Sequence, residues 1–157
     1  TNGFIRGVCV PGTPVNTFLC TKREYTNFVF RAAFKIEGGN SGIQFRSSER
    51  PTKDPAHGRV YGYQSEITPD GHSTGRIYDE ERRGYRNGIV FLDTGTPQER
   101  LAVAKASFRK GGWNEMRVRC EGVHVQTWLN GKPVADWKIR HADIVKGGEL
   151  VFEMTGK

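Results

Sequence analysis

The amino-acid sequence predicts an all-β domain folded as an antiparallel β-sandwich or jelly roll. Apolar and polar residues alternate with a period of two along several segments, which is the pattern of half-buried strands. The 157 residues include 20 glycines and 7 prolines, a composition typical of many strands joined by tight turns. Nine Phe, five Tyr and three Trp are enough to fill a hydrophobic core. We therefore expect a single domain over residues 1–157.

The expected strands follow one another along the chain, with turn residues between them. The clearest covers residues 28–36, where Phe28, Phe30 and Phe34 alternate with residues such as Arg31 and Lys35. Glu121-Gly122 supplies a two-residue hairpin turn. Residues 96–106 could form a helix of a turn or two, although 98–105 fits a strand equally well. Further strands are expected at 41–46, 59–67, 89–92, 116–120, 123–129, 134–137 and 150–154.

The charge of the chain is basic but does not indicate a nucleic-acid partner. Lysines and arginines number 24 and acidic residues 17, which gives a formal net charge of +7. The densest basic cluster, Arg82-Arg83, lies beside Asp79, Glu80 and Glu81, so it is neutralised locally and would track a phosphate backbone poorly. No apolar run approaches the ~20 residues that span a bilayer, so we expect no membrane insertion.

Sequence motifs for metals, phosphates and dinucleotides are missing from the chain. The three cysteines have no C-x-x-C spacing, and the four histidines have no metal-ligand spacing, so we predict neither a metal site nor a cofactor. There is also no P-loop, dinucleotide fingerprint or nucleophile elbow, which leaves phosphoryl and hydride transfer without support. A bridge between Cys9 and Cys20 remains open, because these residues flank a short Pro-Gly-Thr-Pro segment.

Strand alternation gathers a set of polar side chains that suits a sugar. In 41–46, Gln44 and Arg46 share the face opposite the apolar residues, and in 59–67 Gln64 and Glu66 do the same. We expect these four side chains to project into one hollow away from the core. On 123–129, His124 and Trp128 form a similar polar face. Planar amides, carboxylates and guanidinium groups pair with sugar hydroxyls, although any solvated sheet face would present the same residue types.

The densest charged stretch, residues 75–84, has two interpretations. It is either an exposed loop with internal ion pairs worth ~0–1 kcal/mol each or a second part of the site. In the second case Asp79 or Glu80 supplies another carboxylate opposite Glu66, and Arg82 or Arg83 keeps it ionised.

Five blocks of sequence occur in a characteristic order: residues 40–46, 62–67, 75–83, 112–115 and 128–136. Together they resemble a known family, the "domain of unknown function 1080" family. That family is associated with 3-keto-disaccharide hydrolases and 3-keto-glycoside lyases and has the concanavalin A-like lectin/glucanase jelly roll. The resemblance implies that the family's leading strand before residue 1 and closing strand after residue 157 are absent here, and that the protein is periplasmic or extracellular.

The resemblance also implies a reaction and roles for the candidate residues. A ketone at C3 acidifies the C2 proton, so a modest base can start elimination of the group at C1, and water can then add to give net hydrolysis. Glu66 is the expected base, with His124 as the alternative, and Asp79 or Glu80 would act as acid or position the sugar. The other expected substrate-binding residues are Gln44, Arg46 and Gln64 at the oxyanion, Trp128 as a stacking wall, and Tyr78, Arg82 and Arg83.

The sequence leaves other functions and partners open. A non-catalytic carbohydrate-binding module on the same fold is the main alternative. A conventional glucanase would need a second acid two residues from Glu66, where the chain has Gln64. A nucleic-acid binder ranks last. A divalent cation such as calcium could take the role of the arginine, and a sugar 3-oxidoreductase could be a functional partner that supplies the ketone.

Overall fold

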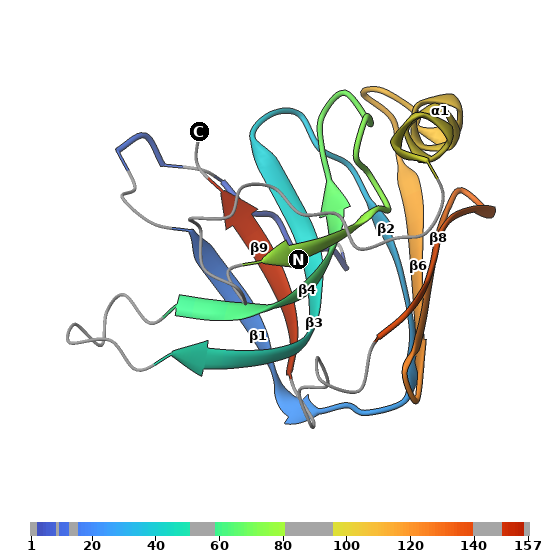
Figure 1. Ribbon diagram of the computed structural model, residues 1–157. Helices are drawn as coiled ribbons and strands as arrows, with labels where there is room; N and C mark the ends of the chain where they lie inside the picture. The colour runs from blue at the N-terminus through green and yellow to red at the C-terminus, as the bar shows by residue number, and fades with distance from the viewer. Residues whose placement is uncertain are drawn as a thin grey trace.

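The computed structural model describes residues 3–8, 10–12, 16–50, 59–80, 96–139 and 149–155. Within them, two antiparallel sheets face each other across a hydrophobic core (Figure 1). One sheet has five strands in the order β1-β9-β3-β4-β5, and the other has four in the order β2-β6-β7-β8. The predicted all-β sandwich is confirmed. The strands are β1 (Thr17–Glu24), β2 (Phe28–Phe34), β3 (Asn40–Arg50), β4 (Arg59–Ile67), β5 (Ile77–Glu80), β6 (Asn114–Glu121), β7 (His124–Leu129), β8 (Lys132–Lys138) and β9 (Glu149–Thr155).

Most of the predicted strands are confirmed, and two strands were missed. The hairpin between β6 and β7 turns at Gly122, whose φ of +53° suits a glycine. Strands β1 and β5 were not predicted from the sequence. The predicted strand at 89–92 and the partner cysteine Cys9 lie outside the described residues, so the bridge from Cys9 to Cys20 stays a prediction.

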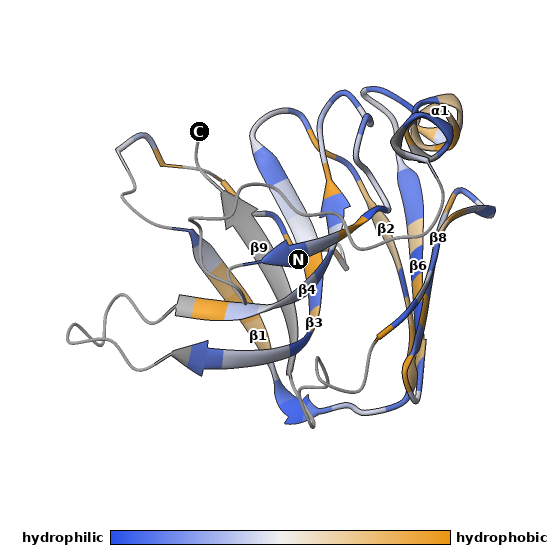
Figure 2. Cartoon of the chain, viewed as in Figure 1, coloured by the Kyte–Doolittle hydropathy of each residue, from blue (hydrophilic) through white to orange (hydrophobic). Residues whose placement is uncertain are grey.

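The core fills the space between the two sheets with the inward residues of each alternating strand. Phe45 and Tyr63 of the five-stranded sheet meet Trp137 of β8, whose ring lies 5.2 Å from that of Tyr63 in an edge-on arrangement. Ser65 also points inward, because its hydroxyl contacts Met116 Sδ at 3.3 Å. Bands of hydrophobic and hydrophilic colour alternate along the strands (Figure 2). The residues between these inward ones therefore face outward.

The segment that fitted either a helix or a strand is a helix, α1 (Pro97–Ser107). Its start is fixed by a capping box: Thr96 Oγ1 accepts from the backbone N–H of Glu99 at 3.3 Å, and Thr96 N–H donates to the Glu99 carboxylate at 3.0 Å. Ala104 packs the helix against Leu129 and Val134 at the edge of the four-stranded sheet. The helix is far too short to cross a membrane, and none of the described helical structure meets that requirement.

Candidate functional site

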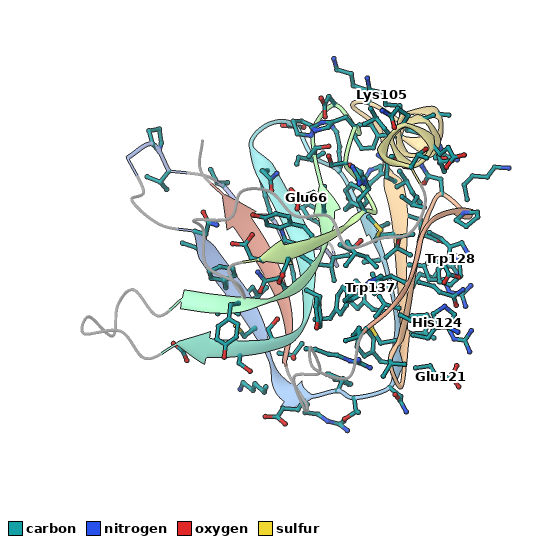
Figure 3. All side chains as sticks on the ribbon, in the orientation of Figure 1. Glu66, Lys105, Glu121, His124, Trp128 and Trp137 are labelled. Carbon is teal, nitrogen blue, oxygen red and sulfur yellow. The ribbon has the colours of Figure 1, made fainter. Side chains whose placement is uncertain are left out.

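Buried polar side chains from three neighbouring strands share the outer face of the five-stranded sheet. Gln44 on β3 pairs in register with Gln64 on β4, and Gln64 pairs with Tyr78 on β5. Gln44, Gln64 and Glu66 are 0 %, 1 % and 7 % exposed, although they point away from the core. Figure 3 shows Glu66 on the side of β4 away from the second sheet, while Trp137 lies between the sheets. The structure thus brings three of the four expected site residues together.

Glu66 is held by amides. Its carboxylate accepts hydrogen bonds from Gln64 Nε2 at 2.9 Å and from Asn40 Nδ2. Burial raises the pKa of Glu66, while the bonds from Gln64 and Asn40 and the field of His72 partly offset that rise. In the part of the chain that the structure describes, Glu66 makes no ion pair. A buried carboxyl with a raised pKa and amide partners is a stronger base than an exposed carboxylate and is suited to accepting a proton.

Two amide atoms beside Glu66 lack hydrogen-bond partners among the described residues. They are Gln44 Nε2, a donor, and Gln64 Oε1, an acceptor, and both are buried. The other ends of the two amides are engaged, since Ser47 Oγ donates to Gln44 Oε1 at 3.4 Å and Gln64 Nε2 binds Glu66. An unsatisfied buried polar atom costs about 1–3 kcal/mol. A polyhydroxylated ligand offers the donor and the acceptor that would satisfy this pair.

Gly42 makes room for the side chain of Gln64. The two strands run so close that an added Cβ at Gly42 would lie 2.4 Å from Gln64 Cδ and 2.8 Å from Gln64 Nε2. Gln64 therefore lies across the backbone of β3 at Gly42. This position directs Gln64 Nε2 towards Glu66.

β5 adds further polar residues to the same face. Tyr78 and Glu80 are in register with Gln64 and Gly62, so they share the outer face with Glu66. Arg76 was missed in the sequence analysis: its backbone oxygen accepts from Glu66 N–H at 3.0 Å, which places Arg76 opposite Glu66. The sequence could have indicated Arg76, because alternate residues of a strand share a face and Arg76 precedes Tyr78 and Glu80 at this spacing.

Asp79 lies on the opposite face of β5, in register with the core residue Tyr63. The structure therefore does not bring Asp79 to Glu66.

Arg46 does not join Gln44, Gln64 and Glu66, contrary to expectation. A bulge between Phe45 and Ser48 interrupts the alternation of β3, and Arg46 adopts a φ of +51° within it. The guanidinium instead donates to the backbone oxygens of Thr26, at 3.4 Å, and Gly122. Arg46 is 4 % exposed and ties these two turns together.

His124 and Trp128 also lie apart from Glu66, on the outer face of the four-stranded sheet (Figure 3). His124 Nε2 lies 2.8 Å from Asp136 Oδ1, and the guanidinium of Arg117 covers the Trp128 ring at 4.6 Å from its centroid. The expectation that they share one site with Glu66 is therefore wrong.

The described structure does not include two of the candidate residues, and it shows no metal-binding cluster among the residues that it describes. Arg82 and Arg83 lie outside the described residues, so their substrate-binding roles stay predictions. Across the described ranges, no group of three or more His, Cys, Asp or Glu side chains could hold a metal ion. The calcium alternative stays a prediction.

Comparison with solved structures shows the same fold. The carbohydrate binding module CBM66 from Bacillus subtilis matches 90 % of this chain and 74 % of its own, with a TM-score of 0.58 and 15 % identity. A protein from Parabacteroides distasonis described as a candidate glycosyl hydrolase matches 90 % of this chain and 77 % of its own, with a TM-score of 0.59 and 20 % identity. A second such protein matches 88 % and 68 %, with a TM-score of 0.53 and 22 % identity.

Comparison of the sequence with family models identifies a matching family. The family model described as a 3-keto-alpha-glucoside-1,2-lyase-like domain matches residues 2–156. Among curated proteins, none matches the chain. The family indicates a sugar-related function for the domain, and the solved structures show its fold.

Proposed function

The chain belongs to the family of 3-keto-alpha-glucoside-1,2-lyase-like domains, and on that premise we propose that it cleaves the glycosidic bond of 3-keto-glycosides, with Glu66 as the base. The observation that carries the proposal is the buried Glu66 carboxyl, whose pKa is raised and whose partners are the amides of Gln64 and Asn40. A base of this kind need only remove a proton that the neighbouring ketone has already made acidic.

The reaction proceeds in two balanced steps. Glu66 takes the proton from C2, the C1–O bond breaks as a C1–C2 double bond forms, and the leaving alcohol takes up a proton. Water then adds its oxygen to C1 and a proton to C2 of the enone, which completes net hydrolysis. Negative charge develops on the C3 oxygen during the first step, so a preorganised donor there lowers the barrier.

The neighbouring residues take the remaining roles in this proposal. Gln44 Nε2 is a buried donor without a partner among the described residues, which suits the developing oxyanion. Gln64 Oε1 accepts from a sugar hydroxyl. Glu80 shares the face and serves as the acid for the leaving group, and Tyr78 offers a ring against the sugar in place of Trp128.

The proposed reaction needs a source of the keto-sugar and a compartment in which the protein meets it. An ordinary glycoside has no acidic C2 proton, so a sugar 3-oxidoreductase must supply the ketone. By resemblance to its family, we propose a periplasmic or extracellular location.

Substitution of the base tests the proposed reaction. Wild type is expected to release free sugar from a 3-keto-disaccharide and none from the unoxidised disaccharide. Glu66→Gln should lower kcat/KM by at least about 100-fold, because general-base catalysis contributes roughly 10²–10⁴-fold. Glu121→Gln is the matched control, since it makes the same change at an exposed residue of the other sheet. Retention of wild-type turnover in Glu66→Gln would overturn the assignment of the base.

A non-catalytic carbohydrate-binding module is the second candidate. The likeness to CBM66, which by its name is a carbohydrate-binding module, favours it. Under this alternative Gln44 Nε2 and Gln64 Oε1, which have no partner among the described residues, bind hydroxyls without turnover. Calorimetric binding of unoxidised glycans, together with no sugar release from the keto form, would support the module over the lyase.

A further inference from the structure

A second feature, which we call the rim pocket, lies where β4 ends and β3 begins. It is formed by residues 35–37, 69–70 and 110–111 and has a volume of about 390 Å³. Small-molecule pockets are typically ~300–1,000 Å³, so a sugar ring fits. None of the roles proposed for the outer face of the sheet uses it.

The first wall of the rim pocket is a braced turn. Thr74 Oγ1 accepts from Thr68 N–H at 3.0 Å and donates to Thr68 O at 3.2 Å, which closes the turn that carries Pro69 and Asp70. The backbone of Gly71 in this turn packs closely against Phe108, since an added Cβ would lie 2.4 Å from the Phe108 ring. The turn is therefore fixed against the segment that leads into the second wall.

The second wall is held by one buried side chain. Asn114, which is 2 % exposed, accepts from Arg109 N–H at 2.8 Å and donates to the backbone oxygens of Arg109, at 2.9 Å, and Gly112, at 3.1 Å. These bonds fix the loop that carries Lys110 and Gly111. A pocket whose walls are already ordered avoids the entropy cost of ordering them on binding.

The chemistry of the rim pocket is amphipathic. Ile36 and Pro69 supply apolar surface, and charged groups surround it. Lys35 pairs with Glu37 at 3.1 Å, and Asp70 pairs with His72 at 2.6 Å. Lys110 makes no ion pair within the described ranges. A sugar ring has the matching character, because its C–H faces are apolar and its hydroxyls accept from an ammonium group.

The rim pocket lies at the same end of the sheet as Glu66. Asn40, three residues after Glu37, donates to the Glu66 carboxylate. On the other wall, Pro69 follows Glu66 by three residues, and Glu66 N–H and C=O are bonded to Arg76 and Gly75 at the return of the same turn. The rim pocket therefore lies next to the end of the strand that carries Glu66.

We infer that the rim pocket binds the leaving-group sugar of a 3-keto-disaccharide, with Lys110 donating to its hydroxyls. This inference rests on the proposed function, because that function places the bond to be cleaved at Glu66. It makes disaccharides better substrates than glycosides with a small leaving group.

Binding to a non-cleaving protein tests the inference separately from catalysis. In the Glu66→Gln background, Kd is measured by calorimetry for a 3-keto-disaccharide and for the matching methyl 3-keto-glycoside. Lys110→Ala should raise Kd for the disaccharide about tenfold, the effect of losing a hydrogen bond to a charged group, and leave Kd for the methyl glycoside unchanged. Lys105→Ala, an exposed lysine on α1 (Figure 3), is the matched control and should change neither.

The outcomes separate the two proposals. A selective loss of disaccharide affinity supports the rim pocket even if the wild-type protein turns out not to cleave the substrate. Equal loss for both ligands, no loss for either, or failure to bind the disaccharide at all would overturn it. If wild type cleaves both substrates and Lys110→Ala shows no selective effect, the lyase stands and the rim pocket does not.

Discussion

At the scale of single residues, the site depends on how Glu66 is solvated. A buried carboxylate paired with a cation is stabilised in its charged form and becomes a weak base. Amide donors from Gln64 and Asn40 stabilise the charge less than a cation would, so burial dominates and the pKa rises. The same amide of Gln64 keeps its oxygen unpartnered within the described structure. One glutamine therefore both orients the proposed base and offers a group to the ligand.

Gly42→Ala tests this arrangement without touching a polar atom. The new Cβ would lie within 2.4–2.8 Å of Gln64. Gln64 must move, and its hydrogen bond to Glu66 is lost. We expect kcat/KM on a 3-keto-disaccharide to fall by about tenfold or more, since one hydrogen bond to a charged group is worth ~1.5–3 kcal/mol.

Gly38→Ala is the control for this substitution. An added Cβ at Gly38 meets nothing within 4 Å, so its activity and stability should match wild type. If Gly42→Ala keeps full activity, Gln64 does not position Glu66.

Alternation along a strand predicted the facing of Gln44, Gln64 and Glu66 but not that of Arg46. The first three lie in regular stretches of β3 and β4, where a period of two holds. Arg46 lies in a bulge, which shifts the register. Nothing in the local sequence marks that bulge, because Arg46-Ser47-Ser48 would also suit a regular strand.

At the scale of elements, the turn between β4 and β5 joins the site to the rest of the sandwich. Thr127 Oγ1 donates to Gly75 O and accepts from Ala135 N–H at 3.1 Å, so β7 and β8 hold the turn from the second sheet. Gly75 has a φ of +87° and lies against Val134. Helix α1 packs on the same edge of the four-stranded sheet through Ala104.

The helix cap gives a stability prediction for this edge. Thr96→Ala removes the side chain that accepts from Glu99 N–H, and it should lower the free energy of unfolding by about 1 kcal/mol. Urea denaturation measures the change, and Thr96→Ser should restore most of the loss because it keeps the hydroxyl. An equal loss in Thr96→Ser would mean that the hydroxyl is not the stabilising group.

Element prediction succeeded or failed according to composition. β2, β6 and β7 alternate clearly and were predicted. β5 is short and lies in the most charged stretch of the chain, so its sequence resembles a loop, and pairing with β4 makes it a strand. The α1 segment has little periodicity, but Thr96-Pro97 followed by Glu99 is a helix-start signal that could have settled the choice.

At the scale of the whole molecule, the two outer faces of the sandwich differ in their exposure. The outer face of the five-stranded sheet buries Gln44, Gln64 and Glu66, whereas that of the four-stranded sheet exposes charged residues such as Arg31, which pairs with Glu115 at 2.6 Å. Alternation predicts which residues share a face of one strand, but it does not say to which sheet a strand belongs. His124 and Trp128 were therefore grouped with Glu66 although a full sandwich separates them.

The buried carboxyl also gives the whole protein a pH-dependent stability. Because the pKa of Glu66 is raised above its ordinary value of 4.5, this carboxyl binds more protons in the native protein than in the unfolded chain between pH 4.5 and its folded pKa. This contribution to the free energy of unfolding is fully present below pH 4.5 and is lost as pH rises through the folded pKa.

Glu66→Gln removes this contribution. The free energy of unfolding of the variant minus that of wild type should therefore increase with pH in urea denaturations from about pH 4 to about pH 8. Glu121→Gln, at an exposed position, is the matched control for the substitution itself. A flat difference for Glu66→Gln would mean that folding leaves the pKa of Glu66 unchanged, and the proposed base would lose its physical basis.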